Sequence, residues 1–230
     1  MPETSVVCIA KNESELRELK NALKRQTYRD FELVTSSKKG IPAAWNDAFS
    51  RAKGKYIVVT ESDALPMNDE WLAQMVKSIK GKDERTIIRG IEVPPLPWCF
   101  CNIVCHASLL KDNKLNEKYP VAEDSELFSR LRKRGYRGLV LPIGPVFHKR
   151  KQKNFSKEVG NYYTYGRLLS KVAMRYGFIG FDSGNGEGVV KRELTTIISR
   201  IAYLFGMIVG FISFRFELKT ISDDDNDKQR

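Results

Sequence analysis

The first 63 residues alternate short apolar runs with amphipathic stretches, and this alternation restricts the fold more than any other feature of the sequence. Three apolar runs are typical of buried strands: residues 5–10, 31–35 and 56–60. The two stretches between them, 12–23 and 41–52, repeat apolar residues at helical spacing. Strands that alternate with helices through short links are typical of a parallel sheet covered by helices. The sequence therefore predicts an α/β fold.

The ends of the two predicted helices carry the expected signals. Asn12 is placed to cap the first helix, with Glu15 reaching back from the third helical position as in a capping box. In the second helix, Pro42 lies near the start and Gly54 just past the end. These signals support the same order of elements.

Carboxylates follow directly after the third predicted strand, as Glu61-Ser62-Asp63. In open α/β sheets, ligands bind at the carboxyl edge of the strands. Carboxylate oxygens there suit a hard divalent cation, and such an ion in turn suits a phosphate-bearing substrate. An acidic turn that merely caps the next element has the same sequence, so both interpretations remain open from this motif alone.

Two later motifs add groups of the same chemical kind. Glu123-Asp124 opens a helical stretch, where both carboxylates also suit the positive end of the helix dipole. His148 follows the run Pro145-Val146-Phe147. The order of these motifs along the chain is more informative than any one of them.

In this order, the segments resemble the family-2 inverting glycosyltransferases with the GT-A fold. The resemblance covers roughly residues 5–177, and its strength is the ordered set of motifs. The similar segments are residues 8–13, 26–28, 31–34, 46, 52–57, 61–63, 116–124, 131–137 and 147–148.

The resemblance implies a Rossmann-like, mixed but mainly parallel sheet that binds a nucleoside-diphosphate sugar. Asp63 and His148 are then the expected ligands of Mn²⁺ or Mg²⁺, and the imidazole favours Mn²⁺. Asp124 is the expected catalytic base, and Glu123 holds the acceptor or orients the start of the helix. The expected donor-binding residues are Ala10, Lys11, Asn12, Glu13, Ser37, Asn46, Glu61 and Ser62.

The chain departs from the family pattern at Lys11, Ser36-Ser37, Trp45 and Glu61, and it lacks the usual Gly-Gly-Phe before Glu123-Asp124. Ser36-Ser37 stand where the family commonly has an aspartate that contacts the nucleobase, and Trp45 precedes Asn46 where a basic residue often meets the diphosphate. These departures leave a second hypothesis, a non-catalytic nucleotide-binding domain tethered to a membrane.

The chain is basic, with a formal net charge of +11, and the excess is concentrated in residues 149–175. This stretch has eight Lys or Arg residues against Glu158 alone, a net charge of +7. Such a patch suits an anionic partner, which is a phospholipid, a phosphorylated substrate or a nucleic acid. The alternatives are a solvated helix face and a basic nucleic-acid binder. We favour a helix at an anionic membrane surface, because tyrosines and aliphatic residues alternate with the charges, and expect no nucleic acid.

Residues 195–214 are largely apolar and are interrupted by Arg200. A single membrane span, a shallow or re-entrant insertion and a buried core helix are all compatible with that length. The basic side precedes this segment, and no cleaved signal is visible at the amino terminus. We therefore expect a catalytic domain on the cytoplasmic face of a membrane and a lipid-linked acceptor.

The expected organisation has five parts. They are a catalytic GT-A domain over 1–150, a basic amphipathic helix region over 151–181, a linker over 182–190, a hydrophobic membrane-associated helix over 191–215 and an acidic tail over 216–230.

Cys99, Cys101 and Cys105 lie close together in the sequence beside His106. Their spacing fits no strong zinc pattern, so we expect buried thiols rather than a metal centre. The resemblance leaves His106 as a possible acceptor-side residue.

Overall fold

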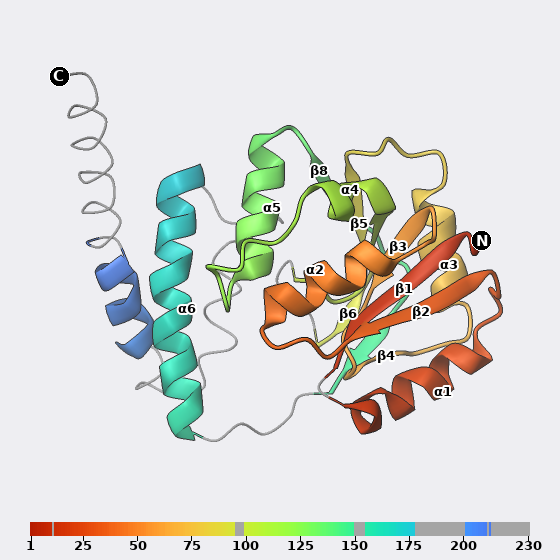
Figure 1. Ribbon diagram of the computed structural model, residues 1–230, viewed down its shortest axis with the longest axis horizontal. Helices are drawn as coiled ribbons and strands as arrows, with labels where there is room; N and C mark the ends of the chain where they lie inside the picture. The colour runs from red at the N-terminus through yellow and green to blue at the C-terminus, as the bar shows by residue number, and fades with distance from the viewer. Residues whose placement is uncertain (11, 95–98, 150–154, 178–200, 211, 213–230) are drawn as a thin grey trace. The chain divides into compact units, whose positions relative to one another are not determined.

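The computed structural model describes residues 1–10, 12–94, 99–149, 155–177, 201–210 and 212 (Figure 1). The described residues fall into two compact units. The first lies within residues 1–151, and the second contains a long helix over 155–176 and a helix over 201–210. The predicted linker over 182–190 and the predicted acidic tail over 216–230 lie outside the described residues.

The first unit is built on a six-stranded sheet with the order β2-β1-β3-β7-β5-β8 (Figure 1). The strands are β1 (Thr4–Ile9), β2 (Phe31–Ser36), β3 (Tyr56–Val59), β5 (Thr86–Arg89), β7 (Ile103–His106) and β8 (Arg137–Val140). β7 alone runs against its neighbours β3 and β5, whereas the other pairings are parallel. The predicted mixed, mainly parallel α/β sheet is therefore confirmed.

A small second sheet in the first unit has the order β4-β9-β6. Its strands are β4 (Ala64–Pro66), β6 (Glu92–Val93) and β9 (Val146–His148). β4 pairs antiparallel with β9, and the register places Ala64 opposite His148. This pairing joins the segment after β3 to a part of the chain more than 80 residues later.

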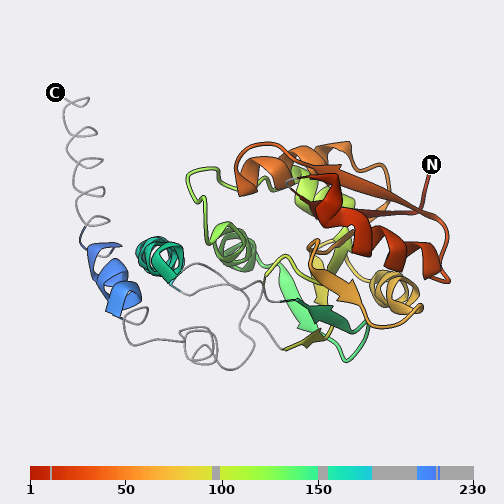
Figure 2. The same ribbon diagram turned by 90° about the horizontal axis from the view of Figure 1, so that it is seen from below.

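Helices cover both faces of the six-stranded sheet (Figure 2). The helical elements are η1 (Glu13–Leu16), α1 (Arg17–Arg25), α2 (Ile41–Arg51), α3 (Trp71–Ile79), α4 (Ala107–Asp112) and α5 (Glu123–Lys133). Side chains of α2, α4 and α5 share one buried cluster with one face of the sheet. Side chains of α1 and α3 share another cluster with the opposite face.

Alternation along the strands produces these two clusters. In β3, Ile57 and Val59 belong to the cluster with α2, while Tyr56 and Val58 belong to the cluster with α1. All four side chains are buried, so both faces of the strand are covered. Continuous apolar runs are typical of strands that are buried on both faces, which explains why the strands predicted from such runs are present.

The second unit contains α6 (Phe155–Tyr176) and the helix over 201–210, which lie side by side in both views (Figures 1 and 2). The helix over 201–210 is the described part of the hydrophobic segment predicted over 191–215. Within the described residues, no helix has both the length and the apolar character that crossing a bilayer needs. A transmembrane helix is thus not confirmed.

Candidate active site

Glu61 and Asp63 lie in a fixed turn at the carboxyl end of β3. The amide of Thr60 donates to the carbonyl of Val7 (3.0 Å), so the chain leaving β3 is held beside β1. The amide of Ala64 then donates to the carbonyl of Glu61 (3.1 Å), which closes the turn. As predicted, these carboxylates are at the edge of the sheet where parallel strands end.

His148 reaches the two carboxylates through the small second sheet. The amide of Lys149 donates to the carbonyl of Asp63 (2.8 Å), beside the Ala64–His148 pair of the β4–β9 ladder. His148 Nε2 then lies 3.1 Å from a carboxylate oxygen of Glu61 and 3.4 Å from one of Asp63. Its other ring nitrogen, Nδ1, is buried and has no hydrogen-bond partner among the described residues. Nε2 is therefore the nitrogen that acts in this cluster.

The three side chains fit a divalent cation. One ligand atom from each of Glu61, Asp63 and His148 lies within 4.8 Å of the others, and all three residues are partly accessible. Two carboxylates and one imidazole form a donor set that suits Mn²⁺ and is less typical of Mg²⁺. Asp63 and His148 were the predicted ligands, and the structure adds Glu61 to them as a candidate.

The carboxylates also control the charge of the imidazole. Hydrogen bonds to Asp63 and Glu61 raise the pKa of His148 to about 10, against the opposing effect of burial. The imidazolium then balances part of the negative charge of the cluster. Because a ligating imidazole must be neutral, a metal ion at this site has to displace that proton.

A second carboxylate pair, Glu123 and Asp124, opens α5. The residue before it, Ala122, has a left-handed backbone (φ 61°), a conformation that is uncommon for a residue with a Cβ and that clusters at functional sites. Asp124 Oδ1 accepts hydrogen bonds from the amide (2.6 Å) and the hydroxyl (3.3 Å) of Ser125. The carboxylate is thereby held in one orientation at the start of the helix.

Burial makes both carboxyl groups poorer acids. It raises the pKa of Asp124 to about 6, and the charge of Glu61 adds to the shift. The pKa of Glu123 is raised well above its usual value by burial and by the charges of Asp124 and Glu61. A carboxylate with a pKa near 6 is ionised at neutral pH and is still basic enough to accept a proton in catalysis. The effect of Glu61 on both groups connects the two acidic clusters.

A hollow of about 470 Å³ lies at the carboxyl ends of β1 and β2, beside the start of α2. It is lined by Ile9, Ala10, Glu15, Ser36, Ser37, Lys38, Lys39, Gly40, Ile41 and Ala44. Two of the predicted donor-binding residues, Ala10 and Ser37, are therefore at this hollow. Gly40 precedes α2 with φ 93°, a conformation that favours glycine.

Lys38 and Lys39 are lining residues that the sequence interpretation missed. They lie between the end of β2 and Gly40, which precedes α2. Their positive charge and the N-terminus of α2 both suit an anionic group. The signal was present in the sequence as a basic pair between a strand and a helix.

Asn12 and Asn46, both predicted to bind the donor, make hydrogen bonds within the protein instead. Asn12 caps η1, with its side-chain oxygen accepting from the amide of Glu15 (3.2 Å), as the sequence predicted. Asn46 holds the backbone of Leu115 by accepting from its amide (2.8 Å) and donating to its carbonyl (3.0 Å). Neither residue lines the hollow of about 470 Å³, so their donor-binding roles stay predictions.

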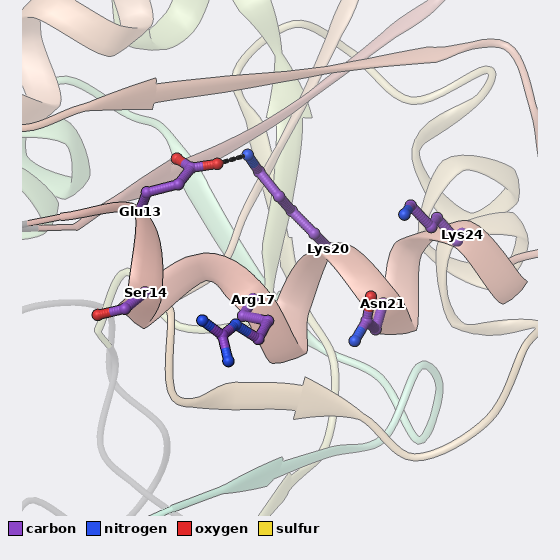
Figure 3. A pocket seen from close by; sticks show the side chains of 6 residues that line it. All are labelled: Glu13, Ser14, Arg17, Lys20, Asn21 and Lys24. Atoms are coloured by element: carbon purple, nitrogen blue, oxygen red, sulfur yellow. Dashed lines mark hydrogen bonds and ion pairs between the residues drawn. The ribbon is translucent and has the colours of Figure 1, made fainter.

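Glu13 lies at a different hollow of about 330 Å³ along the outer side of η1 and α1 (Figure 3). Its carboxylate pairs with Lys20, and the other lining residues are Ser14, Arg17, Asn21 and Lys24. A role of Glu13 in donor binding thus stays a prediction. Ser62 lies in the turn between Glu61 and Asp63, and Lys11 lies outside the described residues.

The cysteines and His106 lie outside the acidic clusters. Cys8, Cys101 and Cys105 are buried free thiols and Cys99 is partly buried, as expected. His106 pairs with Tyr56 in the β3–β7 ladder, so it lies at the start of β3 and away from the carboxyl end that carries Glu61. It contacts the carbonyl of Lys82 (3.0 Å). This position does not support the acceptor-side role considered for His106.

Comparison with protein families matches residues 33–94 to "Glycosyl transferase family 2". The matched segment contains the hollow's Lys38 and Lys39, the whole of β3 and the Glu61–Asp63 turn. No curated protein matches the chain in sequence.

Solved structures share the fold at low sequence identity. A mannosyltransferase from Pyrobaculum calidifontis, in complex with GDP-Man and Mn²⁺, is 16% identical with a TM-score of 0.62, and the match covers 91% of this chain and 73% of that one. TarS 1–349 of S. aureus, in complex with UDP-GlcNAc, is 18% identical with a TM-score of 0.56, and the match covers 77% and 68%.

A third structure is glucosyl-3-phosphoglycerate synthase from Mycobacterium tuberculosis in complex with Mn²⁺, UDP and phosphoglyceric acid. It is 13% identical with a TM-score of 0.58, and the match covers 80% of this chain and 81% of that one. These likenesses show a GT-A-like fold. Together with the family match, they support a glycosyltransferase.

Proposed function

We propose that the protein is a metal-dependent, inverting glycosyltransferase that moves a sugar from a nucleoside-diphosphate donor to an acceptor hydroxyl. The observation that carries this proposal is that two acidic clusters lie close enough for the charge of Glu61 to raise the pKa values of Glu123 and Asp124. One cluster, Glu61, Asp63 and His148, suits a divalent cation, and the other provides a carboxylate with a pKa of about 6. The fold and the family match support the same reaction class.

The donor nucleotide is assigned to the hollow of about 470 Å³, whose lining combines Ser37 with the cations Lys38 and Lys39. Glu61, Asp63 and His148 would hold the divalent ion, which when bound supplies positive charge beside the diphosphate leaving group. Two of the similar structures contain Mn²⁺ together with a nucleotide or nucleotide sugar. That pairing supports Mn²⁺ or Mg²⁺ as the cofactor and leaves the sugar and the base to experiment.

The chemical step assigned to this chain is a proton transfer at Asp124. The acceptor hydroxyl loses its proton to the Asp124 carboxylate as its oxygen bonds to the anomeric carbon. The bond from that carbon to the diphosphate breaks at the same time, so the configuration at the anomeric carbon is inverted. Ser125 holds one oxygen of Asp124, which leaves the other oxygen to accept the proton. Glu123 would position the acceptor beside it.

We further propose a lipid-linked acceptor and a position on the cytoplasmic face of a membrane. The net charge of +7 over residues 149–175 supports an anionic surface as the place of action. With the acceptor in that surface, the active site would meet both a soluble donor and a membrane-bound hydroxyl.

The test combines nucleotide binding with transfer. Thermal shifts with UDP-, GDP- and dTDP-sugars, each with and without Mn²⁺, identify the donor, because a ligand stabilises the state that binds it. The identified donor is then assayed with wild type, Asp124→Asn and the control Asp112→Asn, which changes an exposed aspartate at the end of α4. Nucleotide binding by wild type without transfer or donor hydrolysis would instead favour the non-catalytic hypothesis. Inversion is read from the anomeric configuration of the product.

A further inference from the structure

The two helices of the second unit contact each other backbone to backbone. Gly166 of α6 lies against the main-chain oxygen of Tyr203, and Gly206 lies against that of Tyr163. Gly210 lies against the main-chain oxygen of Arg167. A Cβ on any of these glycines would overlap a main-chain atom, so only glycine permits this approach. We call Gly166, Gly206 and Gly210 the glycine contact.

The glycine contact is a packing mode characteristic of helices in lipid. Gly206 and Gly210 are four residues apart, which places both on the same side of their helix. In lipid, apolar side chains gain nothing by leaving the solvent, so helices associate through small residues that let their backbones touch. Tyr203 is buried, and the rings of Tyr163 and Phe205 stack with 6.0 Å between their centroids.

Large apolar side chains of the helix over 201–210 remain exposed beside this contact, including Phe205, whose ring stacks on that of Tyr163. Five of them, counting residue 212, are between 54% and 60% exposed, and they are Ile201, Leu204, Phe205, Ile208 and Ile212. Ile201, Leu204, Ile208 and Ile212 follow one another at intervals of three or four residues, and Phe205 is adjacent to Leu204. The five therefore form one stripe along the helix, which we call the outer stripe. A contiguous apolar surface of this kind marks an interaction site on a protein.

The positive charge of α6 favours one of two possible occupants of the outer stripe. α6 carries Arg167, Lys171 and Arg175 on one side, at intervals of four residues. A second copy of this chain would bring an equally cationic α6, and the two helices would repel each other. An anionic bilayer instead offers acyl chains for the stripe and phosphate groups for the cations.

We propose that the outer stripe inserts into the interfacial region of an anionic bilayer, with the cations of α6 at the level of the headgroups. The described helix over 201–210 meets α6 through the glycine contact and exposes the outer stripe. This one-sided exposure suits a helix that lies along the interface. This inference rests on the membrane location in the proposed function and assigns residues to it.

The test measures binding of the full chain to vesicles of phosphatidylcholine alone, or with about a third of phosphatidylglycerol. Wild type is expected to float with the anionic vesicles, and less so in about 0.5 M salt because screening weakens the cationic contacts. Leu204→Glu/Ile208→Glu is expected to reduce vesicle binding about tenfold or more, since two charges enter the apolar layer. Both positions are exposed, so the variant should fold.

The matched control is Met67→Glu/Val140→Glu, which places the same charges at two apolar positions of the first unit. Both residues are 54% exposed, and vesicle binding should remain at the wild-type level. Vesicle binding by Leu204→Glu/Ile208→Glu equal to wild type would overturn the proposal. If wild type is instead a dimer that does not bind vesicles, and Leu204→Glu/Ile208→Glu is a monomer, the outer stripe is the contact with a second copy of the chain.

Donor hydrolysis in vesicle-free solution separates this inference from the proposed function. Leu204→Glu/Ile208→Glu should hydrolyse the donor as wild type does, because the proposed site lies in the first unit. If wild type binds vesicles but neither transfers nor hydrolyses the donor, the membrane-binding proposal is supported and the proposed enzymatic function is rejected.

Discussion

The strand β3 of the first unit and the helix over 201–210 of the second unit differ in how they place their apolar side chains. In the first unit, β3 buries Ile57 and Val59 on one face and Tyr56 and Val58 on the other, under helices. In the second unit, the helix over 201–210 contacts its neighbour through glycine and leaves the outer stripe exposed. Large apolar side chains are thus buried on both faces of β3, whereas five of them form an exposed stripe on and just after the helix over 201–210. Composition alone does not distinguish the two uses.

The largest expected effect is the loss of transfer when the metal is removed. EDTA should reduce transfer to background, and Asp63→Ala should remove the Mn²⁺-dependent thermal shift produced by the donor. The physical reason is that Asp63 lies in the cluster that suits the ion. Asp112→Ala serves as the control. Full activity in EDTA would leave Lys38 and Lys39 to neutralise the diphosphate and would end the metal-dependent interpretation.

The second effect concerns Asp124. Asp124→Asn keeps the oxygen that accepts from Ser125 but cannot accept a proton, so kcat should fall about 10²–10⁴-fold, with donor affinity little changed. In contrast, Leu204→Glu/Ile208→Glu in the second unit should hydrolyse the donor in solution as wild type does. This difference between the two variants would localise the chemistry in the first unit. Wild-type turnover by Asp124→Asn would move the base elsewhere.

A matched pair of leucine variants measures the contrast between the units directly. Leu72→Ala removes a fully buried side chain from α3, and its cost should be about 2–5 kcal/mol in the free energy of unfolding. Leu204→Ala shortens a side chain that is 60% exposed, and its cost in vesicle-free buffer should be within about 0.5 kcal/mol. Urea titration monitored by circular dichroism compares the two. Equal costs would show that Leu204 is part of a core.

The smallest effect is a pH dependence that follows from Asp124. Its pKa is raised to about 6, so at saturating Mn²⁺ kcat should decline about tenfold per pH unit below that value. The raised pKa of Asp124 also affects the stability of the folded state, which it favours at low pH, where kcat declines. Because the folded state binds this proton more tightly than the unfolded state, Asp124 favours folding below its ordinary pKa and loses this contribution as pH rises through about 6.

Thermal unfolding of Asp124→Asn checks that sign. Above pH 7 the variant lacks the buried charge, so it should unfold at a higher temperature than wild type. A lower unfolding temperature for Asp124→Asn above pH 7, or an acid limb of kcat near pH 4, would contradict the raised pKa.

Local patterns predicted much of the first unit. The apolar runs that became β1, β2 and β3, the Asn12 cap and the carboxylates after β3 all follow from periodicity and from neighbouring residues. Such signals depend on which face of an element is buried, and a few residues of sequence contain that information. The resemblance to a family added His148 and Asp124, which no local pattern connects to Glu61.

Other roles depended on contacts between distant segments. Asn46 was a predicted donor-binding residue, but its amide group holds the backbone of Leu115. Glu13 pairs with Lys20 on the outer side of α1. In the second unit, the sequence predicted an apolar helix, yet the glycine contact that directs the outer stripe outward involves residues about 40 positions apart.

The sequence by itself determined the alternation of three strands and two helices over residues 5–60, the carboxylates at the end of β3 and the excess of positive charge over 149–175. The tertiary structure decided that Glu61 joins Asp63 and His148, because the β4–β9 pairing brings His148 Nε2 to 3.1 Å and 3.4 Å from the two carboxylates. It also decided the acidity of Asp124, since burial and the charge of Glu61 raise its pKa. Periodicity specifies which face of an element is buried, whereas electrostatic coupling depends on distances between atoms that only the folded chain brings together.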